Sequence, residues 1–208
     1  MKLLHIDSSV LGEGSASRRL SAAIVVAFAR AVPDLETVRR DLDADPIPHL
    51  DSRRLPSVRP ANAPQGATGV PDDKGAGALD EFLAADIVVI GAPMYNFTIP
   101  SQLKAWIDRI LIAGKTFRYS EAGPVGLAGG KRVIIASSRG GLYAPGMPFE
   151  ANDFQERYLR AVFAFIGIED VEIVRAEGLA LGPEQRDAAV QAALESVPSA
   201  SFATRLAA

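Results

Sequence analysis

The stretch IVVIGAPMYNF, residues 87–97, says most about how this chain folds. Its first five residues are apolar, rich in β-branched side chains and too few for a helix, which is typical of a buried parallel strand. Side chains that follow such a strand reach the crevice where α/β proteins bind ligands. Here a thioether, a phenol, an amide and a phenyl ring stand in a row, between Pro93 and Pro100. We expect either a flat ligand that covers these groups or a plug of core side chains beneath a loop.

A second short apolar run, residues 2–6, leads into the serine-rich segment DSSVLGEGSASR, residues 7–18. The apolar-rich stretch from 18 to 30 is then typical of a helix, with Ser15 or Ser17 as its N-cap. Free N–H groups at a helix start, with hydroxyl groups and Arg18 beside them, suit a phosphate dianion. The alternative is a plain capping serine on a surface helix, although four serines in one connection weigh against it.

A third segment, SSRGG at 137–141, follows the apolar run 132–136. Paired glycines let a backbone turn sharply and bring its N–H groups close to a ligand. Such an arrangement favours a partly negative atom. By itself the segment is more typical of a simple turn from strand to helix. Taken with the other two, it indicates a hydroxyl-rich phosphate site and two loops that bind a ring.

Three better-known motifs do not fit these segments. The run GEGSAS at 12–17 has serine where the dinucleotide fingerprint requires its third glycine, and it begins several residues past the strand. The run GKT at 114–116 ends like a Walker loop, but Arg109 replaces the required glycine. The run ASSRG at 136–140 resembles a nucleophile elbow, yet both histidines of the chain lie upstream of it.

Composition narrows the class of protein. The 208 residues suit one domain, 1–208. With no cysteine and two scattered histidines, we expect neither disulfides nor a metal site. A net charge of −3 with both signs dispersed argues against a nucleic-acid partner. No stretch has the pattern of a secretion signal or a bilayer span, so we expect a cytoplasmic protein that binds no membrane.

Strand and helix patterns alternate along the chain. Strands are expected at 2–6, 36–40, 87–91, 132–137 and 171–176. Helices are expected at 18–30, 77–84, 101–113, 151–166 and 183–195. The alternation predicts an α/β fold with a doubly wound parallel sheet and helices on both faces. A Pro- and Gly-rich excursion is expected at about 45–77, and a short hairpin between 117–119 and 124–127.

These residues resemble those of the FMN-dependent NADH-azoreductases and NADH:quinone oxidoreductases, which are flavodoxin-like enzymes. The resemblance runs from residue 2 to about 194 and includes further matching segments: DPIP at 45–48, QLK at 102–104, TFRY at 116–119, FIGI at 165–168 and AEG at 176–178. It implies the flavodoxin-like strand order 2-1-3-4-5. It also implies bound FMN, with NADH or NADPH as transient donor, and reduction of quinones and aromatic azo compounds by hydride transfer in two steps.

The resemblance also implies which residues bind FMN. The phosphate and ribityl chain would contact Ser9, Ser15, Ala16 and Ser17. The isoalloxazine ring would contact Met94, Tyr95, Asn96, Phe97, Ser138, Arg139, Gly140 and Gly141. No side chain is assigned as a catalytic acid, and Tyr95 and Tyr119 are candidate substrate contacts. Of the glycine-free loop after Ala92, Asn96 is the one residue expected to tolerate a positive φ.

Two further expectations concern partners and alternatives. On the predicted helix 151–166, Phe154, Tyr158, Val162 and Phe165 recur at helical spacing, and other apolar residues widen that surface. The excess favours a second buried face, and the resemblance implies a homodimer with both FMN sites at the interface. The alternatives to a quinone reductase are a flavodoxin-like one-electron carrier, a general NAD(P)H:FMN reductase, and an α/β domain without flavin.

Overall fold

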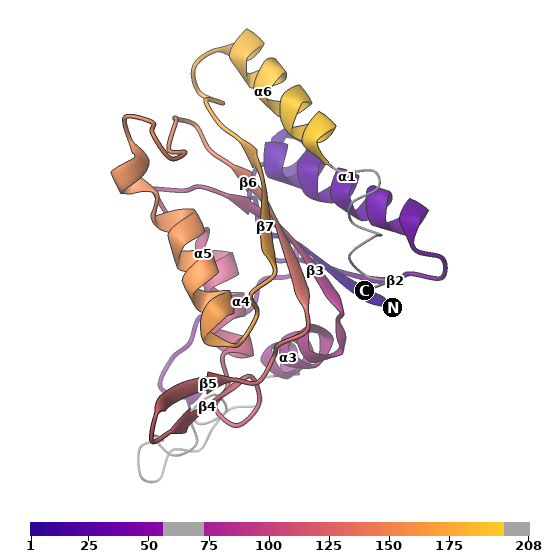
Figure 1. Ribbon diagram of the computed structural model, residues 1–208, viewed down its shortest axis with the longest axis vertical. Coiled ribbons are helices and arrows are strands. Elements are labelled where there is room, and N and C mark those ends of the chain that lie inside the picture. Colours follow the sequence, from indigo (N-terminus) through magenta and orange to yellow (C-terminus); the bar gives the residue numbers. More distant parts are fainter. Residues whose placement is uncertain (56–72, 198–208) are drawn as a thin grey trace.

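A five-stranded parallel sheet forms the centre of the protein, whose computed structural model describes residues 1–55 and 73–197 (Figure 1). Its strands are β1 Lys2–Asp7, β2 Glu36–Asp41, β3 Ile87–Pro93, β6 Arg132–Ser138 and β7 Val171–Ala176. Their order in space is β2-β1-β3-β6-β7. All five predicted strands are therefore confirmed, and the order corresponds to 2-1-3-4-5 of a flavodoxin-like sheet.

Helices cover both faces of the sheet (Figure 1). They are α1 Ala16–Ala31, α3 Asp73–Ala84, α4 Ser101–Ile110, α5 Phe154–Phe165 and α6 Pro183–Ser196, with short 3-10 turns η1 Gly12–Gly14 and η3 Glu150–Asn152. Helices α1 and α6 lie on one face, and α3, α4 and α5 lie on the other. Most of the excursion predicted at 45–77 lies outside the described residues. None of the helices in the described part is long and apolar enough to cross a membrane.

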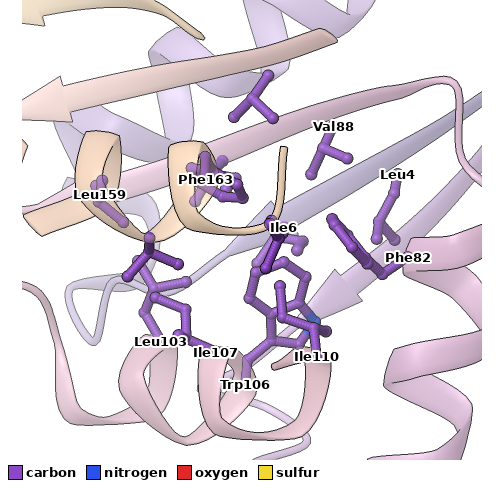
Figure 2. Packing of buried hydrophobic residues seen from close by; sticks show 14 of the residues in the cluster. Leu4, Ile6, Phe82, Val88, Leu103, Trp106, Ile107, Ile110, Leu159 and Phe163 are labelled. Atoms are coloured by element: carbon purple, nitrogen blue, oxygen red, sulfur yellow. The ribbon is translucent and has the colours of Figure 1, made fainter. Parts of the chain in front are cut away.

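The core forms two apolar layers because successive side chains of a strand point to opposite faces. On β3, Val89 packs with α1 and α6, and Val88 packs with the other three helices. Figure 2 shows the second layer, in which Trp106 of α4 meets Phe82 of α3 edge to face, with ring centroids 5.9 Å apart. Burial on both faces explains why the central strands are continuous apolar runs in the sequence.

Several helices have bounds that differ from the predicted ones. Helix α1 begins at Ala16 instead of residue 18, and α3 begins at Asp73 instead of residue 77, inside the predicted excursion. For α4 and α5 the cause is visible. Helix α4 ends at Ile110 instead of residue 113, because the Thr116 hydroxyl donates to the carbonyl of Ile110 at 2.6 Å and accepts from Ile112 N at 3.0 Å. Helix α5 begins at residue 154 instead of 151. There the Asp153 carboxylate accepts from Glu156 N at 3.0 Å and so caps the helix. In both places a polar side chain sets the boundary.

The predicted hairpin is confirmed as β4 Phe117–Ser120 paired with β5 Gly123–Gly126. It packs against the end of α5, where a Cβ on Gly126 would lie 2.1 Å from Gly167 N, so only glycine fits. Since α4 and α5 both run back from the carboxyl ends of the strands, the hairpin lies at the end of the sheet where the strands begin (Figure 1).

Candidate active site

Three loops leave the carboxyl ends of neighbouring strands. Loop 1 is residues 8–15 after β1, loop 2 is 94–100 after β3, and loop 3 is 139–153 after β6. The register pairs Pro93 with Ser138, so loops 2 and 3 start side by side, and β1 adjoins β3. The structure thus brings all three predicted site segments to one edge of the sheet, where the carboxyl ends of parallel strands form the ligand-binding crevice of α/β folds.

Hydrogen bonds tie the loops to one another. The Tyr95 hydroxyl in loop 2 lies 3.2 Å from Ser9 Oγ and accepts from Val10 N, also at 3.2 Å. Met94 N donates to the carbonyl of Ser138 at 2.7 Å. The Tyr95 hydroxyl therefore holds loop 2 against loop 1, and its ring is the part that remains for a ligand.

The start of α1 carries the N–H groups of the predicted phosphate site. Ser15 caps the helix, since its Oγ accepts from Arg18 N at 3.2 Å, and it also lies 3.1 Å from Ser17 Oγ. Among the described residues, the N–H groups of Ala16 and Ser17 in the first turn have no protein acceptor. Their dipoles and the helix dipole favour an anion at this point.

Gly91 lets the first turn of α1 approach the end of β3. A Cβ there would lie 3.0 Å from Asp7 Oδ1 and 3.3 Å from the carbonyl oxygen of Ser17. Asp7 itself is buried next to this point. Burial disfavours its carboxylate, but contacts with His5 and Arg39 outweigh burial and hold the pKa of Asp7 below its usual value. The carboxylate beneath the phosphate site is thus already paired.

The Arg18 side chain anchors loop 1 instead of pointing at a ligand. Its Nε and Nη2 donate to the carbonyl of Ser9 at 3.2 and 2.8 Å, and its Nη2 donates to Asp41 Oδ1 at 2.8 Å. The hydrogen bond from Arg18 lowers the pKa of Asp41 to about 2. The expectation that this guanidinium assists the phosphate directly is wrong, because both of its edges already bind protein oxygens.

Loop 2 contains a two-residue hairpin turn. Tyr95 N donates to the Thr98 carbonyl at 2.9 Å, and Thr98 N donates back at 3.1 Å. Asn96 and Phe97 between them have φ values of 49° and 71°. We expected only Asn96 to adopt such a conformation, but a turn that matches the twist of its strands needs positive φ at both positions. For the bulky Phe97 this conformation is strained, which points to a functional site.

Loop 2 therefore presents N–H groups and an aromatic ring. Within the described part of the chain, Asn96 N and Phe97 N have no protein acceptor. The Phe97 side chain is 46% exposed, although it is a large apolar group. Exposed N–H donors beside an exposed phenyl ring suit a flat ligand with electron-rich atoms at its edge.

At the start of loop 3, three successive carbonyl groups bind the segment that follows β7. The carbonyls of Arg139, Gly140 and Gly141 accept from Leu179 N, Ala180 N and Gly178 N at 3.2, 3.0 and 3.0 Å. By contrast, the N–H groups of Gly140 and Gly141 have no acceptor in the described ranges. Two neighbouring N–H groups without acceptors are what an anion-binding loop at this position would need.

Arg139 requires a correction to its predicted role. Its side chain is fully buried and donates to Asp153 at 2.9 Å and to Glu156 and Glu177. The guanidinium therefore cannot contact a ring at the surface. Its N–H is also engaged, since it donates to the Ala176 carbonyl at 3.0 Å. Arg139 belongs to the site through the loop that it begins and not through direct contact.

Tyr143 is a site residue that the sequence interpretation missed. Its ring lies over Gly141, where an added Cβ would come within 3.0 Å of it. It also meets Phe97 edge to face with centroids 6.3 Å apart, and Phe149 with centroids 6.2 Å apart. Its place two positions after Gly141 was the available signal, because a loop that binds a ring extends beyond its glycines.

Tyr119 lies far from these loops within one chain. It is on the β4–β5 hairpin at the opposite end of the sheet, and 72% of its surface is exposed. Its ring packs edge to face on Phe117, which in turn contacts Phe165 of α5. A substrate contact by Tyr119 at these loops therefore requires a second chain.

The comparisons with known proteins agree with this arrangement. A family model described as flavodoxin-like fold matches residues 1–199. An FMN-dependent NADH:quinone oxidoreductase of Methylocella silvestris is 57% identical over 198 residues, which are 95% of this chain and 97% of that protein. A second protein of that description, from Bradyrhizobium diazoefficiens, is 57% identical and covers 96% of this chain and 98% of its own.

Solved structures show the same similarity. An FMN-dependent NADH-azoreductase from Bacillus anthracis, determined in complex with FMN, has a TM-score of 0.84 and 30% identity, covering 100% of this chain and 99% of that one. Another azoreductase from the same species has a TM-score of 0.83 and 30% identity, covering 95% and 96% of the two chains.

Proposed function

The chain belongs to the flavodoxin-like family of FMN-dependent NADH:quinone oxidoreductases, and from this membership we propose that it reduces quinones and aromatic azo compounds with NADH through bound FMN. The observation that carries the proposal is the meeting of loops 1, 2 and 3 at one sheet edge. Loops 2 and 3, and the first turn of α1 that follows loop 1, present N–H groups that lack acceptors among the described residues. Such donors suit the phosphate and the electron-rich ring edge of FMN.

We assign different parts of FMN to different loops. We assign to its phosphate and ribityl chain the serine-rich connection from β1 into α1, namely Ser9, Ser15, Ala16 and Ser17. We assign to its ring the residues of loops 2 and 3 and the preceding strand end, namely Met94, Tyr95, Asn96, Phe97, Ser138, Gly140 and Gly141, with Tyr143 added. Arg139 is not assigned to the ring, because its guanidinium and its N–H both bind protein groups.

When bound, FMN supplies the hydride chemistry, and the protein supplies position, shielding and electrostatics. The N–H groups of Gly140 and Gly141 are fixed donors of the kind that stabilise added negative charge. The Phe97 and Tyr143 rings exclude water from one side and select flat acceptors. Since the Tyr95 hydroxyl is bonded to loop 1, we assign the proton of the second step to water.

We further propose that the protein is a homodimer. Phe154 on α5 is 55% exposed, and Tyr119, Val125 and Leu127 on and just beyond the hairpin are exposed apolar side chains as well. A hollow of about 600 Å³ between loop 2, α4 and α5 is lined in part by Tyr95, Ile99 and Tyr158. A second copy packed on this face would bury these side chains and bring its Tyr119 toward loop 2. Consumption of NADH favours a cytoplasmic location, which we also propose.

The central experiment follows the visible flavin absorbance of the FMN-loaded protein without oxygen. We expect NADH to bleach it directly and a quinone to restore it. Absence of a flavin spectrum after reconstitution would favour the alternative of an α/β domain without flavin. A spectrum that NADH leaves unchanged would favour the one-electron carrier. Sedimentation at micromolar concentration tests the dimer, and a monomer with full activity would contradict it.

A further inference from the structure

The most deeply buried charges near the site surround Arg139 and play no part in the function described so far. The Arg139 side chain has no exposed surface, yet it lies directly before Gly140 and Gly141. Its Nη1 donates to Asp153 at 2.9 Å and to Glu177 at 3.3 Å. Its Nε has no hydrogen-bond partner among the described residues, so the bonds of its two terminal nitrogens hold this buried charge in place.

The second nitrogen, Nη2, extends the network to the strands. It donates to Ser137 Oγ and to Gln155 Oε1, both at 3.1 Å, and to the Glu156 carboxylate. Gln155 is buried as well, and its Nε2 donates to the Ala92 carbonyl at 2.8 Å. Arg139 is thereby linked to the end of β3, two residues before Met94 in loop 2.

The carboxylate partners extend the network to loop 3 and α5. Glu177 accepts from Tyr143 N at 2.8 Å while it also accepts from Arg139. Asp153 caps α5 and binds Arg139 at the same time. The two ends of the short segment that carries Gly140 and Gly141 are therefore held by one buried cluster: Arg139 at one end and Tyr143 at the other.

We propose that Arg139 is a positioning residue for the flavin, which holds the Gly140 and Gly141 N–H groups in their binding geometry without contacting the cofactor. This inference rests on the proposed function, because it concerns the FMN site. Glycines have the greatest backbone freedom of all residues, so two of them in an irregular loop need an outside anchor to keep both donors in place. The bond between Glu177 and Tyr143 N completes that anchor.

Arg175 is a matched control in the same cluster. It forms two hydrogen bonds with Glu156, at 2.9 and 2.5 Å, and its side chain is 30% exposed. It has no hydrogen bond to loop 3 among the described residues, and its replacement removes the same charge. An effect of net charge or of general stability appears in both variants, whereas an effect of positioning appears only at Arg139.

The experiment measures FMN affinity of the apoprotein by flavin fluorescence and the midpoint potential of the bound FMN. We expect Arg139→Gln to weaken FMN binding by about 10- to 100-fold, by analogy with the loss when a group that orients metal ligands is removed. The potential should shift to more negative values, because loosened N–H donors favour added negative charge less. We expect Arg139→Lys to have an FMN affinity and a potential between those of wild type and Arg139→Gln. Arg175→Gln should leave both quantities close to wild type.

The outcomes separate this inference from the proposed function. If the wild-type protein binds no FMN, the proposed function fails. If wild type binds FMN and Arg139→Gln binds it equally well, or if Arg175→Gln is as strongly affected, the positioning role is overturned. Circular dichroism of each apoprotein checks that it is folded. Should Arg139→Gln not fold, Arg139→Lys and Glu177→Ala decide, and unchanged affinity and potential in both would contradict the proposal.

Discussion

Loops 1 and 3 are both anchored by an arginine, but in different ways. Arg18 binds loop 1 through the Ser9 carbonyl and pairs with Asp41, with 15% and 22% of the two side chains exposed. Arg139 has no exposed surface and contacts three carboxylates. The free N–H donors next to loop 1 belong to the first turn of α1, where the helix already fixes them. The donors of loop 3 belong to glycines outside any helix, so there a buried anchor replaces the helix.

The largest difference between the anchors should appear in stability. We expect Arg139→Met to lower the free energy of unfolding by about 3–5 kcal/mol, because three carboxylates lose a buried partner. Urea unfolding of the apoprotein measures this loss. A loss below about 1 kcal/mol would mean that Arg139 contributes no more to stability than an exposed ion pair does. The two arginines would then not differ as anchors.

The second prediction tests the glycine backbone of loop 3. Gly141→Val should weaken FMN binding by about tenfold or more, since a Cβ at this position collides with the Tyr143 ring at 3.0 Å and displaces the loop. Gly14→Ala in loop 1 is the control, because an added Cβ there meets nothing within 4 Å. Fluorescence titration compares the two variants.

Combining Gly141→Val with Tyr143→Ala sharpens that test. If the collision with the Tyr143 ring causes the loss, removal of the ring should restore part of the affinity, and the two changes should not add. Additive losses would mean that the valine side chain excludes the cofactor directly.

The third prediction concerns the weaker anchor. Arg18→Gln should lower the free energy of unfolding by about 1 kcal/mol or less, as expected for a partly exposed ion pair. FMN affinity should fall by less than it does in Arg139→Gln. Since salt screens exposed charges, high ionic strength should reduce the difference between Arg18→Gln and wild type. An effect as large as that of Arg139→Met would make the two anchors equivalent.

The smallest effect is expected from the pH dependence of the Arg18–Asp41 pair. The hydrogen bond from Arg18 holds the pKa of Asp41 at about 2, below its value near 4 in an unfolded chain. A lowered pKa adds stability that is complete above about pH 4 and is lost as the pH falls through about 2. The difference in unfolding free energy between wild type and Asp41→Asn should therefore narrow over this interval. A difference independent of pH would show that Asp41 acts without its charge.

The fold was predictable because its signals are local. Continuous apolar runs marked the five strands, and the serine before α1 marked its start. The three site segments were also predictable, since each follows a strand and the carboxyl ends of parallel strands share one edge. The helix ends were harder to predict. Helix α4 stops at Ile110 because the hydroxyl of Thr116, six positions further along the chain, binds the Ile110 carbonyl.

The roles of individual side chains depended on distant contacts. The carboxylates that draw Arg139 inward lie 14 to 38 positions along the chain, so no local pattern shows that its guanidinium is buried. Phe97 adopts a positive φ because the two bonds between Tyr95 and Thr98 force a tight turn. The sequence made Tyr119 a candidate substrate contact near loops 2 and 3, but α4 runs back along the sheet and places the β4–β5 hairpin at its other end.

The sequence by itself determined the sheet, its helices and the three loops that form the site, because hydrophobic periodicity and helix capping act over a few residues. The tertiary structure alone decided which groups in those loops remain free to bind. A charged side chain is stable in the interior only where enough oppositely charged groups surround it. For Arg139 those carboxylates come together only when α5, β7 and loop 3 have packed. Arg139 therefore lies beneath the site, and the glycine N–H groups face it.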